Sequence, residues 1–484
     1  MDTLNDKSLI KDKCLIAGKW VGGSETADVV NPATGALITT VPRLGAKETE
    51  EAIAGAAEAM KGWAKKTAKE RSIVLRRWYD LMMENQDDLA RIMTAEQGKP
   101  LAEAKGEVVY GASFTEFYAE EAKRIYGETI PSHKPDARIV VQRQPIGVVA
   151  AITPWNFPMA MITRKVSPAL AAGCGVVCKP ASDTPLTALA IAELANRAGL
   201  PEGLFSVITG SAGAIGGALT SSDTVKALTF TGSTEIGRVL MEQCAATIKK
   251  VDLELGGNAP FIVFDDADLD AAVTGAMASK YRNAGQTCVC ANRILVQDGV
   301  YDTFSEKLAK AVMDLKVGQG TEVGVTTGPL INAAAVEKVE EHVQDAVANG
   351  AEIVVGGKAH ELGGNFYQPT VLKNVTTKML VTNEETFGPV APLFRFKTEQ
   401  EAVDLANDTE FGLASYFYSR DIGRCWRVAE ALETGIVGIN EGIISTEVAP
   451  FGGVKQSGLG REGSHHGITE FTEIKYMLMG GLDS

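Results

Sequence analysis

The stretch GVVAAITPWNFP, residues 147–158, decides the fold because it joins a buried strand to a rigid polar loop. Its first half, Gly147–Thr153, is an apolar run with branched side chains, which is typical of a strand buried on both faces of a sheet. Similar runs recur at Gly175–Lys179, Leu204–Thr209, Ala227–Thr231 and Val251–Leu255. We therefore expect a set of neighbouring buried strands.

Helical patterns separate these runs. Leu186–Ala198 has apolar residues at helical spacing and is closed by Gly199-Leu200-Pro201, and Ser233–Ile248 has the same character. Strands that alternate with helices predict an α/β fold with a parallel sheet and right-handed crossovers. Such a sheet binds its ligands at the carboxyl ends of its strands.

A second alternating region begins at Pro260. Phe261–Phe264 is predicted to be a strand, and Asp268–Arg282 a helix whose first turn carries acidic residues that suit the helix dipole. The helix leads directly into Asn283-Ala284-Gly285-Gln286-Thr287-Cys288. This pattern predicts a second α/β domain that extends to about Pro450.

Two segments fit neither domain. Ile130–Arg143 contains two prolines and ends in an alternating stretch, and Ile468–Met479 near the C-terminus is similar. They are either arms that reach another subunit or plain edge strands, and the pattern fits both equally.

The totals limit the possible functions. A chain of 484 residues exceeds the roughly 250–300 residues at which one core stops growing, so two or more domains are expected. The net charge of −14 argues against nucleic acid or anionic lipid as a general partner, and means that an anionic substrate needs local cations.

Cysteine usage and hydropathy indicate the compartment. Seven cysteines in so long a chain do not form a disulfide framework. Met1–Lys13 is charged and lacks the apolar core of a signal peptide, and no apolar run approaches the ~20 residues that span a bilayer. We expect a reduced, cytoplasmic compartment and no contact with a membrane.

Cys288 is the candidate nucleophile. Gly285 and the polar residues around it predict a loop, and Arg282 places a positive charge nearby that would favour the thiolate, the species able to attack an aldehyde carbon. Cys290 lies two residues on, and Cys-x-Cys with scattered histidines does not make a metal site. Cys290 is either a packed neighbour or a redox partner that forms a reversible disulfide with Cys288.

Two further residues suit the same chemistry. Glu254 ends an apolar run, where a carboxylate is costly to bury. It is therefore either a general base or a glutamate that caps a helix or forms a salt bridge. The glycines Gly256 and Gly257 allow the backbone to turn beside a ligand. Asn156 lies in a loop fixed by two prolines, where a rigid amide can stabilise an oxyanion; the alternative is an ordinary turn.

The cofactor signals lie at strand ends. Phe230–Gly237 passes from strand to helix, so that its glycines and hydroxyls lie where a helix N-terminus meets a phosphate. Lys179 is placed to reach a ribose or phosphate, and Glu385 to hold a second ribose through its hydroxyls.

Taken together, these motifs resemble the aldehyde dehydrogenase superfamily over nearly the whole chain, from about Ile16 to Tyr476. The ordered motifs are Pro154–Pro158, Lys179–Ser182, Phe230–Gly237, Glu254–Gly257, Gly285–Cys288, Glu384–Pro389, and Asn440 with Pro450–Gly453. The resemblance implies Cys288 as nucleophile, Glu254 as general base, and Asn156 with the backbone N–H of Cys288 as the oxyanion hole. The implied cofactor contacts are Trp155, Lys179, Ser182, Gly232, Ser233, Glu385 and Phe387.

The resemblance also implies an organisation. A Rossmann-type dinucleotide-binding domain would span residues 1–122 and 143–256, and a catalytic domain residues 257–455. A small β oligomerisation arm and the C-terminal tail would span residues 123–142 and 456–484, and the protein would be a homodimer or homotetramer.

Three further segments resemble the succinate-semialdehyde dehydrogenases: Met161–Lys165, Tyr281–Asn283 and Asn440–Ser445. In these enzymes of GABA degradation, Arg164, Arg282 and Ser445 would hold the far carboxylate of the substrate. The charge argument agrees, because two arginines can select an acid-ended aldehyde on an acidic protein. Glutarate-semialdehyde dehydrogenases look nearly the same, since one methylene is worth only ~1–3 kcal/mol.

Position 182 bears on the cofactor. NAD-preferring relatives often carry glutamate there, whereas Ser182 does not repel a 2′-phosphate and, with Lys179 nearby, favours NADP over NAD. Asp183 brings a negative charge back and argues the other way.

Other functions compete with this interpretation. A CoA-acylating aldehyde dehydrogenase would pass the acyl group to CoA, but Glu254 favours hydrolysis. A cysteine hydrolase generally needs a histidine base, and no histidine lies in these motifs. A non-catalytic protein on the same scaffold would not need the complete set of site residues.

Overall fold

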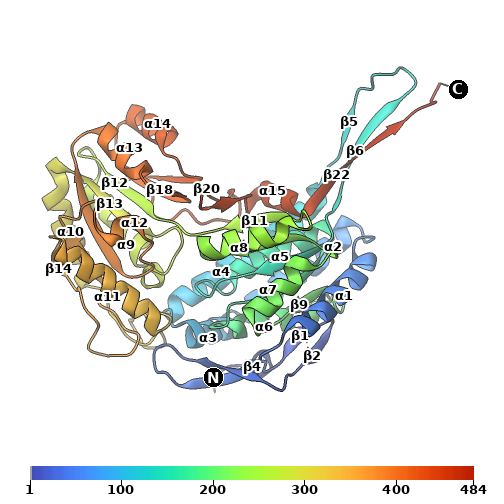
Figure 1. Ribbon diagram of the computed structural model, residues 1–484, viewed down its shortest axis with the longest axis horizontal. Helices are drawn as coiled ribbons and strands as arrows, with labels where there is room; N and C mark the ends of the chain where they lie inside the picture. The colour runs from blue at the N-terminus through green and yellow to red at the C-terminus, as the bar shows by residue number, and fades with distance from the viewer. Residues whose placement is uncertain (1–2, 484) are drawn as a thin grey trace.

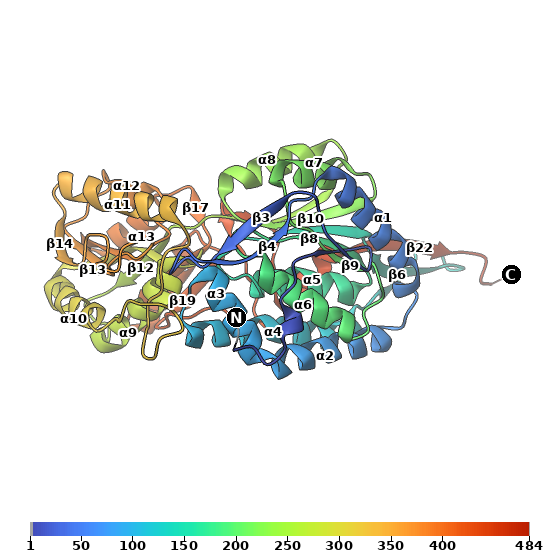
Figure 2. The ribbon, with the colours of Figure 1, turned by 90° about the horizontal axis from the view of Figure 1, so that it is seen from below.

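The computed structural model describes residues 3–483 and contains two large sheets that lie side by side (Figures 1 and 2). The eight-stranded sheet has the order β2-β1-β9-β8-β7-β10-β11-β21. Its strands are β1 (Cys14–Ile16), β2 (Lys19–Val21), β7 (Val148–Ile152), β8 (Gly175–Lys179), β9 (Phe205–Val207), β10 (Val225–Thr231), β11 (Lys250–Glu254) and β21 (Gly458–Leu459). Strands β7 to β11 are mutually parallel, which confirms the predicted parallel sheet.

Helices cover both faces of this sheet because its strands are apolar on both sides. One face packs on α1 (Ala46–Trp63), α7 (Ala212–Ser221) and α8 (Thr234–Ala245). The other face packs on α5 (Ala160–Ala172) and α6 (Pro185–Arg197), which are covered in turn by α2 (Ala68–Glu84), α3 (Gln86–Gln97) and α4 (Leu101–Glu121). The predicted helices at 186–198 and 233–248 correspond to α6 and α8.

The second sheet has seven strands in the order β14-β15-β16-β13-β12-β18-β19, all parallel except β14. The strands are β12 (Ala259–Val263), β13 (Ala291–Gln297), β14 (Glu352–Val355), β15 (Thr370–Lys373), β16 (Val390–Phe396), β18 (Ala414–Tyr418) and β19 (Ile436–Ile439). The predicted second α/β region is therefore confirmed.

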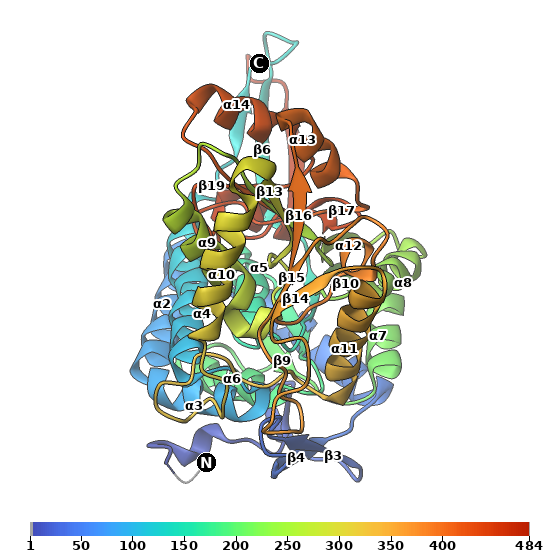
Figure 3. The same cartoon turned by 90° about the vertical axis from the view of Figure 1, so that its left-hand side faces the viewer.

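Helices also cover both faces of the second sheet, and Figure 3 shows α10 and α11 on opposite sides of it. They are α9 (Leu269–Tyr281), α10 (Tyr301–Met313), α11 (Ala333–Ala348), α12 (Leu380–Asn383), α13 (Glu399–Asn407) and α14 (Ile422–Ala431). Helix α9 matches the predicted helix at 268–282, and Asp268 caps it by accepting the N–H of Ala271 at 3.1 Å.

The two segments outside the predicted domains, Ile130–Arg143 and Ile468–Met479, form strands that pair with each other. Strands β5 (Glu128–Ile130), β6 (Arg138–Pro145) and β22 (Thr472–Met479) form an antiparallel sheet in the order β22-β6-β5. This sheet projects from the body of the molecule (Figure 1). Smaller elements complete the fold: β3 (Thr26–Val30) with β4 (Leu37–Pro42), β17 (Phe411–Gly412) with β20 (Val454–Lys455), and α15 (Ser464–Gly467).

Candidate active site

Cys288 follows a loop with unusual backbone geometry between α9 and β13. Asn283, Ala284 and Gly285 are consecutively left-handed, with φ of 53°, 54° and 76°. The Asn283 side chain stabilises this strained turn, because its Nδ2 donates to the backbone oxygens of Asn156 at 3.0 Å and Gln286 at 3.1 Å. A Cβ on Gly285 would lie 2.1 Å from the oxygen of Gly388, so the loop fits only with glycine there.

Cys288 is partly exposed, whereas the other six cysteines are buried. Burial nevertheless raises the pKa of the Cys288 thiol to about 12. The charges of Arg164 and Arg282 act in the opposite direction, as expected from the sequence, but burial is the larger effect.

Glu254 ends strand β11 beside this loop. Both of its carboxylate oxygens are buried and lack a hydrogen-bond partner, so it is neither a helix cap nor a hydrogen-bonded member of an ion pair. Burial, reinforced by the charge of Glu462, raises the pKa of Glu254 well above its ordinary value. The charge of Glu254 also acts to raise the pKa of the Cys288 thiol.

The glycines after Glu254 explain how the two segments meet. A Cβ on Gly257 would lie 2.5 Å from the backbone oxygen of Cys288. The N–H of Gly257 donates to Glu385 Oε1 at 3.3 Å. This close approach, rather than a sharp turn, is what requires glycine here.

Asn156 lies in the loop after β7, directly beside the Cys288 loop. Its Nδ2 donates one hydrogen to the backbone oxygen of Gln286 at 3.1 Å, and an amide has a second hydrogen to offer. The side chain is buried, with 4% of its surface exposed, and its Oδ1 has no partner. The geometry suits a donor to a developing oxyanion.

Several predicted cofactor residues lie at the carboxyl ends of parallel strands of the first sheet, whereas Glu385 and Phe387 lie in the loop before β16. Ser233 caps α8 by accepting the N–H of Ile236 at 3.4 Å, and Gly232 donates to the backbone oxygen of Glu254 at 3.1 Å. A Cβ on Gly232 would lie 2.4 Å from the ring of Phe230, so this strand-to-helix turn requires glycine. The N-terminus of α8 thus faces outward with no bulky side chain before it, which suits a phosphate.

The remaining cofactor candidates flank that turn. Lys179 ends β8 and is nearly buried, and this burial lowers the pKa of its ammonium. Ser182 is exposed three residues later. The rings of Trp155 and Phe387 meet edge to face with centroids 5.5 Å apart. Burial raises the pKa of Glu385 to about 7, with the N–H of Gly257 opposing the shift.

Of the three predicted substrate residues, the structure brings two into one cavity. Arg282 and Ser445 line a cavity of about 290 Å³ together with Lys99, Glu103, Gly106, Glu107, Tyr110, Phe157 and Ile443. Arg164 does not line it. It is ion-paired with buried Glu462 and its guanidinium lies 4.2 Å from the ring centre of Phe451. Burial disfavours the charge of Arg164, but Glu462 outweighs this and raises its pKa.

Cys290 is buried, and its thiol donates to the backbone oxygen of Lys280 at 3.2 Å. This contact fits the interpretation of Cys290 as a packed neighbour. The disulfide between Cys288 and Cys290 stays a prediction.

Several residues of the site were not identified from the sequence. Glu462 accepts ion pairs from both Arg164 and Lys165, and all three are buried. Lys99 and Glu107 form a second buried pair beside the cavity. The partners of each ion pair lie in different elements of the structure, so no local sequence pattern predicts these pairs.

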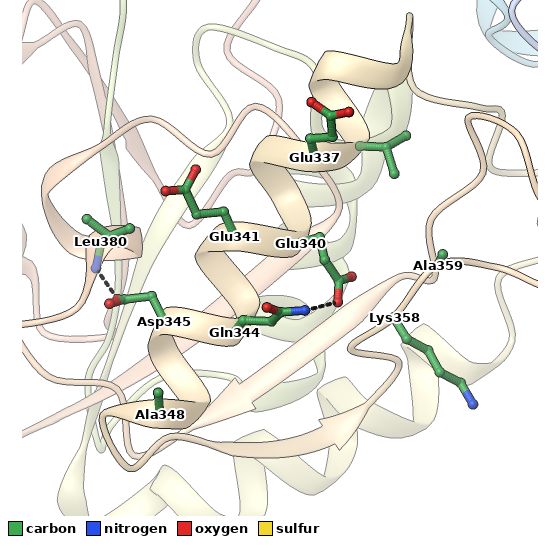
Figure 4. Close-up of a pocket in the computed structure, with 10 residues that line it drawn as sticks. Glu337, Glu340, Glu341, Gln344, Asp345, Ala348, Lys358, Ala359 and Leu380 are labelled. Atoms are coloured by element: carbon green, nitrogen blue, oxygen red, sulfur yellow. Dashed lines mark hydrogen bonds between the residues drawn. The ribbon is translucent and has the colours of Figure 1, made fainter.

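A hollow on the outer side of α11 lies elsewhere. It is lined by acidic and amide side chains, among them Glu337, Glu340, Glu341, Gln344 and Asp345 (Figure 4). It contains none of the predicted site residues, and its carboxylates disfavour an anionic ligand.

Within residues 3–483, no group of three or more histidine, cysteine or acidic side chains is arranged to hold a metal ion. No helix in the described part of the chain is both long and apolar enough to cross a membrane.

Fold and comparison together define an enzyme that oxidises aldehydes: the aldehyde dehydrogenase family model matches residues 20–477, and the chain belongs to this family. It is 66% identical to the glutarate-semialdehyde dehydrogenase of Pseudomonas aeruginosa over 99% of this chain and 100% of that protein. It is also 66% identical to the succinate-semialdehyde dehydrogenase [NADP(+)] of Escherichia coli, over 99% of each chain. A crystal structure of an NADP-dependent enzyme of E. coli matches with a TM-score of 0.98 and 65% identity, over 99% of this chain and 100% of that one.

The protonation of Glu254 is directly measurable. At about pH 6, where an exposed glutamate is ionised, Glu254 should still give the infrared carbonyl band of a protonated carboxyl, and Glu254→Gln should remove it. Asp252→Asn should shift the disappearance of this band to lower pH, because the charge of Asp252 raises the pKa of Glu254. The control Asp302→Asn, on the surface, should leave the band unchanged. Absence at pH 6 of any band sensitive to Glu254→Gln would contradict the burial argument.

Proposed function

We propose that this enzyme oxidises an acid-ended aldehyde, with succinate semialdehyde as the first candidate, to the dicarboxylic acid. The observation that carries the proposal is the partly exposed Cys288 beside the unpartnered carboxyl of Glu254, next to a cavity that presents Arg282 and Ser445. The names of the two relatives support the substrate class. Glutarate semialdehyde is the alternative, because one methylene changes binding by only ~1–3 kcal/mol.

The chemistry begins with removal of a proton. Because burial disfavours the thiolate of Cys288, a base must take the proton of its thiol, and we assign this role to the carboxylate form of Glu254. Burial raises the pKa of Glu254, so its carboxylate, once formed, is a stronger base than that of an exposed glutamate. The sulfur then adds to the aldehyde carbon, and the free N–H of Asn156 with the backbone N–H of Cys288 stabilises the oxyanion. Glu254 releases the proton taken from Cys288 to solvent before hydrolysis. Its carboxylate then removes a proton from the water that attacks the thioester and passes this proton to the departing sulfur, which releases the acid and the thiol.

A nicotinamide cofactor, when bound, accepts the hydride. The N-terminus of α8 behind Gly232 and Ser233 suits its phosphates, and the carboxyl of Glu385 suits ribose hydroxyls. Trp155, Lys179 and Phe387 flank the same place.

The catalytic roles can be separated by rapid mixing. Cys288→Ala should abolish reduction of the cofactor altogether. Glu254→Gln should retain a burst of reduced cofactor when a base is supplied by raised pH, but should lower steady-state kcat about a hundredfold or more, because the water loses its base. Equal loss without a burst in both variants would contradict the assignment. The same assay with added CoA distinguishes an acylating enzyme, whose turnover CoA would accelerate.

Ser182 supports NADP as the preferred cofactor, because an exposed hydroxyl beside Lys179 does not repel a 2′-phosphate. Ser182→Glu should lower kcat/KM for NADP about tenfold or more, by charge repulsion worth at least ~1.4 kcal/mol, and should spare NAD. The matched control Ser182→Ala removes only the hydroxyl and should have a smaller effect. A wild-type enzyme that prefers NAD would overturn this assignment.

Arg282 supports recognition of the far carboxylate because it lines the cavity. Arg282→Ala should lower kcat/KM for succinate semialdehyde by roughly ten- to a hundredfold, since a charge-assisted hydrogen bond contributes ~1.5–3 kcal/mol. Butanal, a neutral aldehyde of the same length, serves as the control substrate, and kcat/KM for butanal should change little. Equal losses for both aldehydes would show that Arg282 does not read the carboxylate. Arg164 acts from behind the cavity, through its charge.

We also propose that the enzyme is a cytoplasmic homo-oligomer that uses the projecting sheet as its arm. Ile474, Tyr476 and Met479 on β22 are 58–63% exposed, which is unusual for apolar side chains on a strand and typical of a contact surface. The domain limits proposed are residues 1–122 with 143–256, residues 257–455, and the arm and tail at 123–142 and 456–484. A role in GABA degradation follows if succinate semialdehyde is the substrate.

A further inference from the structure

A buried ion pair lies between helix α4 and the loop that carries Asn156. Lys99, in the turn between α3 and α4, donates through Nζ to Glu107 Oε2 at 2.5 Å, and each side chain is only 1% exposed. Burial lowers the pKa of Lys99, while the charge of Glu107 opposes that shift. A buried pair of this kind contributes little net stability by itself, since desolvation offsets the attraction.

The Lys99–Glu107 pair is hydrogen-bonded to both ends of the Asn156 loop. Lys99 Nζ donates to the backbone oxygen of Asn156 at 2.8 Å and lies 4.1 Å from the ring centre of Phe157. Glu107 Oε1 accepts the backbone N–H groups of Met159 at 2.9 Å and Ala160 at 3.3 Å. One ion pair therefore fixes the residue that carries the amide, its neighbour, and the first turn of α5.

The same backbone oxygen connects the loop to the nucleophile. Besides Lys99, the oxygen of Asn156 accepts Asn283 Nδ2 at 3.0 Å, and Asn283 also donates to Gln286. Asn156 Nδ2 in turn donates to the oxygen of Gln286. Lys99 thus anchors the point at which the Asn156 loop and the Cys288 loop are joined.

We propose that the Lys99–Glu107 pair is a positioning device for the oxyanion hole: it holds the Asn156 amide at the place where negative charge develops. The inference rests on the proposed role of Asn156. Catalysis is sensitive to such placement, because a shift of about 1 Å can cost on the order of a hundredfold in rate. Neither Lys99 nor Glu107 exchanges a proton with the substrate in this role.

The test is a cycle of variants with the burst rate of cofactor reduction as readout. The double variant Lys99→Met/Glu107→Gln removes the ion pair without leaving a buried charge, and the glutamine oxygen can still accept from Met159 and Ala160. It should slow the burst at saturating aldehyde about tenfold, less than the loss of the whole donor. In an Asn156→Ala background the same double substitution should cost less than about twofold further.

The matched control for destabilisation is Asp88→Asn. Asp88 is also a buried carboxylate, and it accepts the backbone N–H groups of Asn5 and Asp6 away from the site. At equal loss of thermal stability it should leave the burst unchanged. If the double variant does not fold, Lys99→Arg keeps a cation but displaces the loop, and it should slow the burst only when Asn156 is present.

The outcomes are distinguishable. An equal loss in both backgrounds, no loss in either, or an equal loss in the Asp88→Asn control would overturn the positioning role while Asn156→Ala still slows the burst. A burst unaffected by Asn156→Ala would instead overturn the proposed oxyanion role, and the positioning role with it.

Discussion

The backbone of Gly257 lies so close to the carbonyl of Cys288 that a Cβ on residue 257 would come within 2.5 Å of that oxygen. The site depends on this contact, because it places the end of β11, which carries Glu254, against the loop that carries the nucleophile. The backbone N–H of Gly257 also donates a hydrogen bond to Glu385. A side chain at residue 257 would push apart the segments that carry Cys288, Glu254 and Glu385.

Burial follows from this close approach and sets the state of the ionisable groups. For Cys288, Glu254 and Glu385 alike, burial is the largest effect on the pKa and raises it. Burial thus disfavours the charged form of each of these groups, and the nearby cation Arg164 is paired with Glu462. A dry site strengthens each interaction that forms when the reaction develops charge.

The sequence predicted those features that depend on local pattern. The parallel strands were found because they are apolar on both faces, and helix α9 because acidic residues lie in its first turn. Helix α5 was not predicted, because all thirteen of its residues are buried and it has no amphipathic stripe. Helix α7 was not predicted because its glycines are unfavourable in a helix. In the site, Cys288, Glu254 and Asn156 stand out by local context. The charge near Cys288 is visible in the sequence, whereas the burial that opposes ionisation of the thiol is not. The pairs of Glu462 with Arg164 and of Glu107 with Lys99 could not be predicted, because they form only when the chain folds.

The most direct measurement is the pH dependence of alkylation of Cys288 in the free enzyme, followed by mass spectrometry of the peptide that contains it. If burial controls the site, the reaction should keep accelerating well into the alkaline range, with no plateau near neutrality. In Glu254→Gln the thiol should still ionise only above neutral pH, because Cys288 remains buried. A plateau of reactivity at or below neutral pH would show that the sulfur is already a thiolate, and would contradict the account.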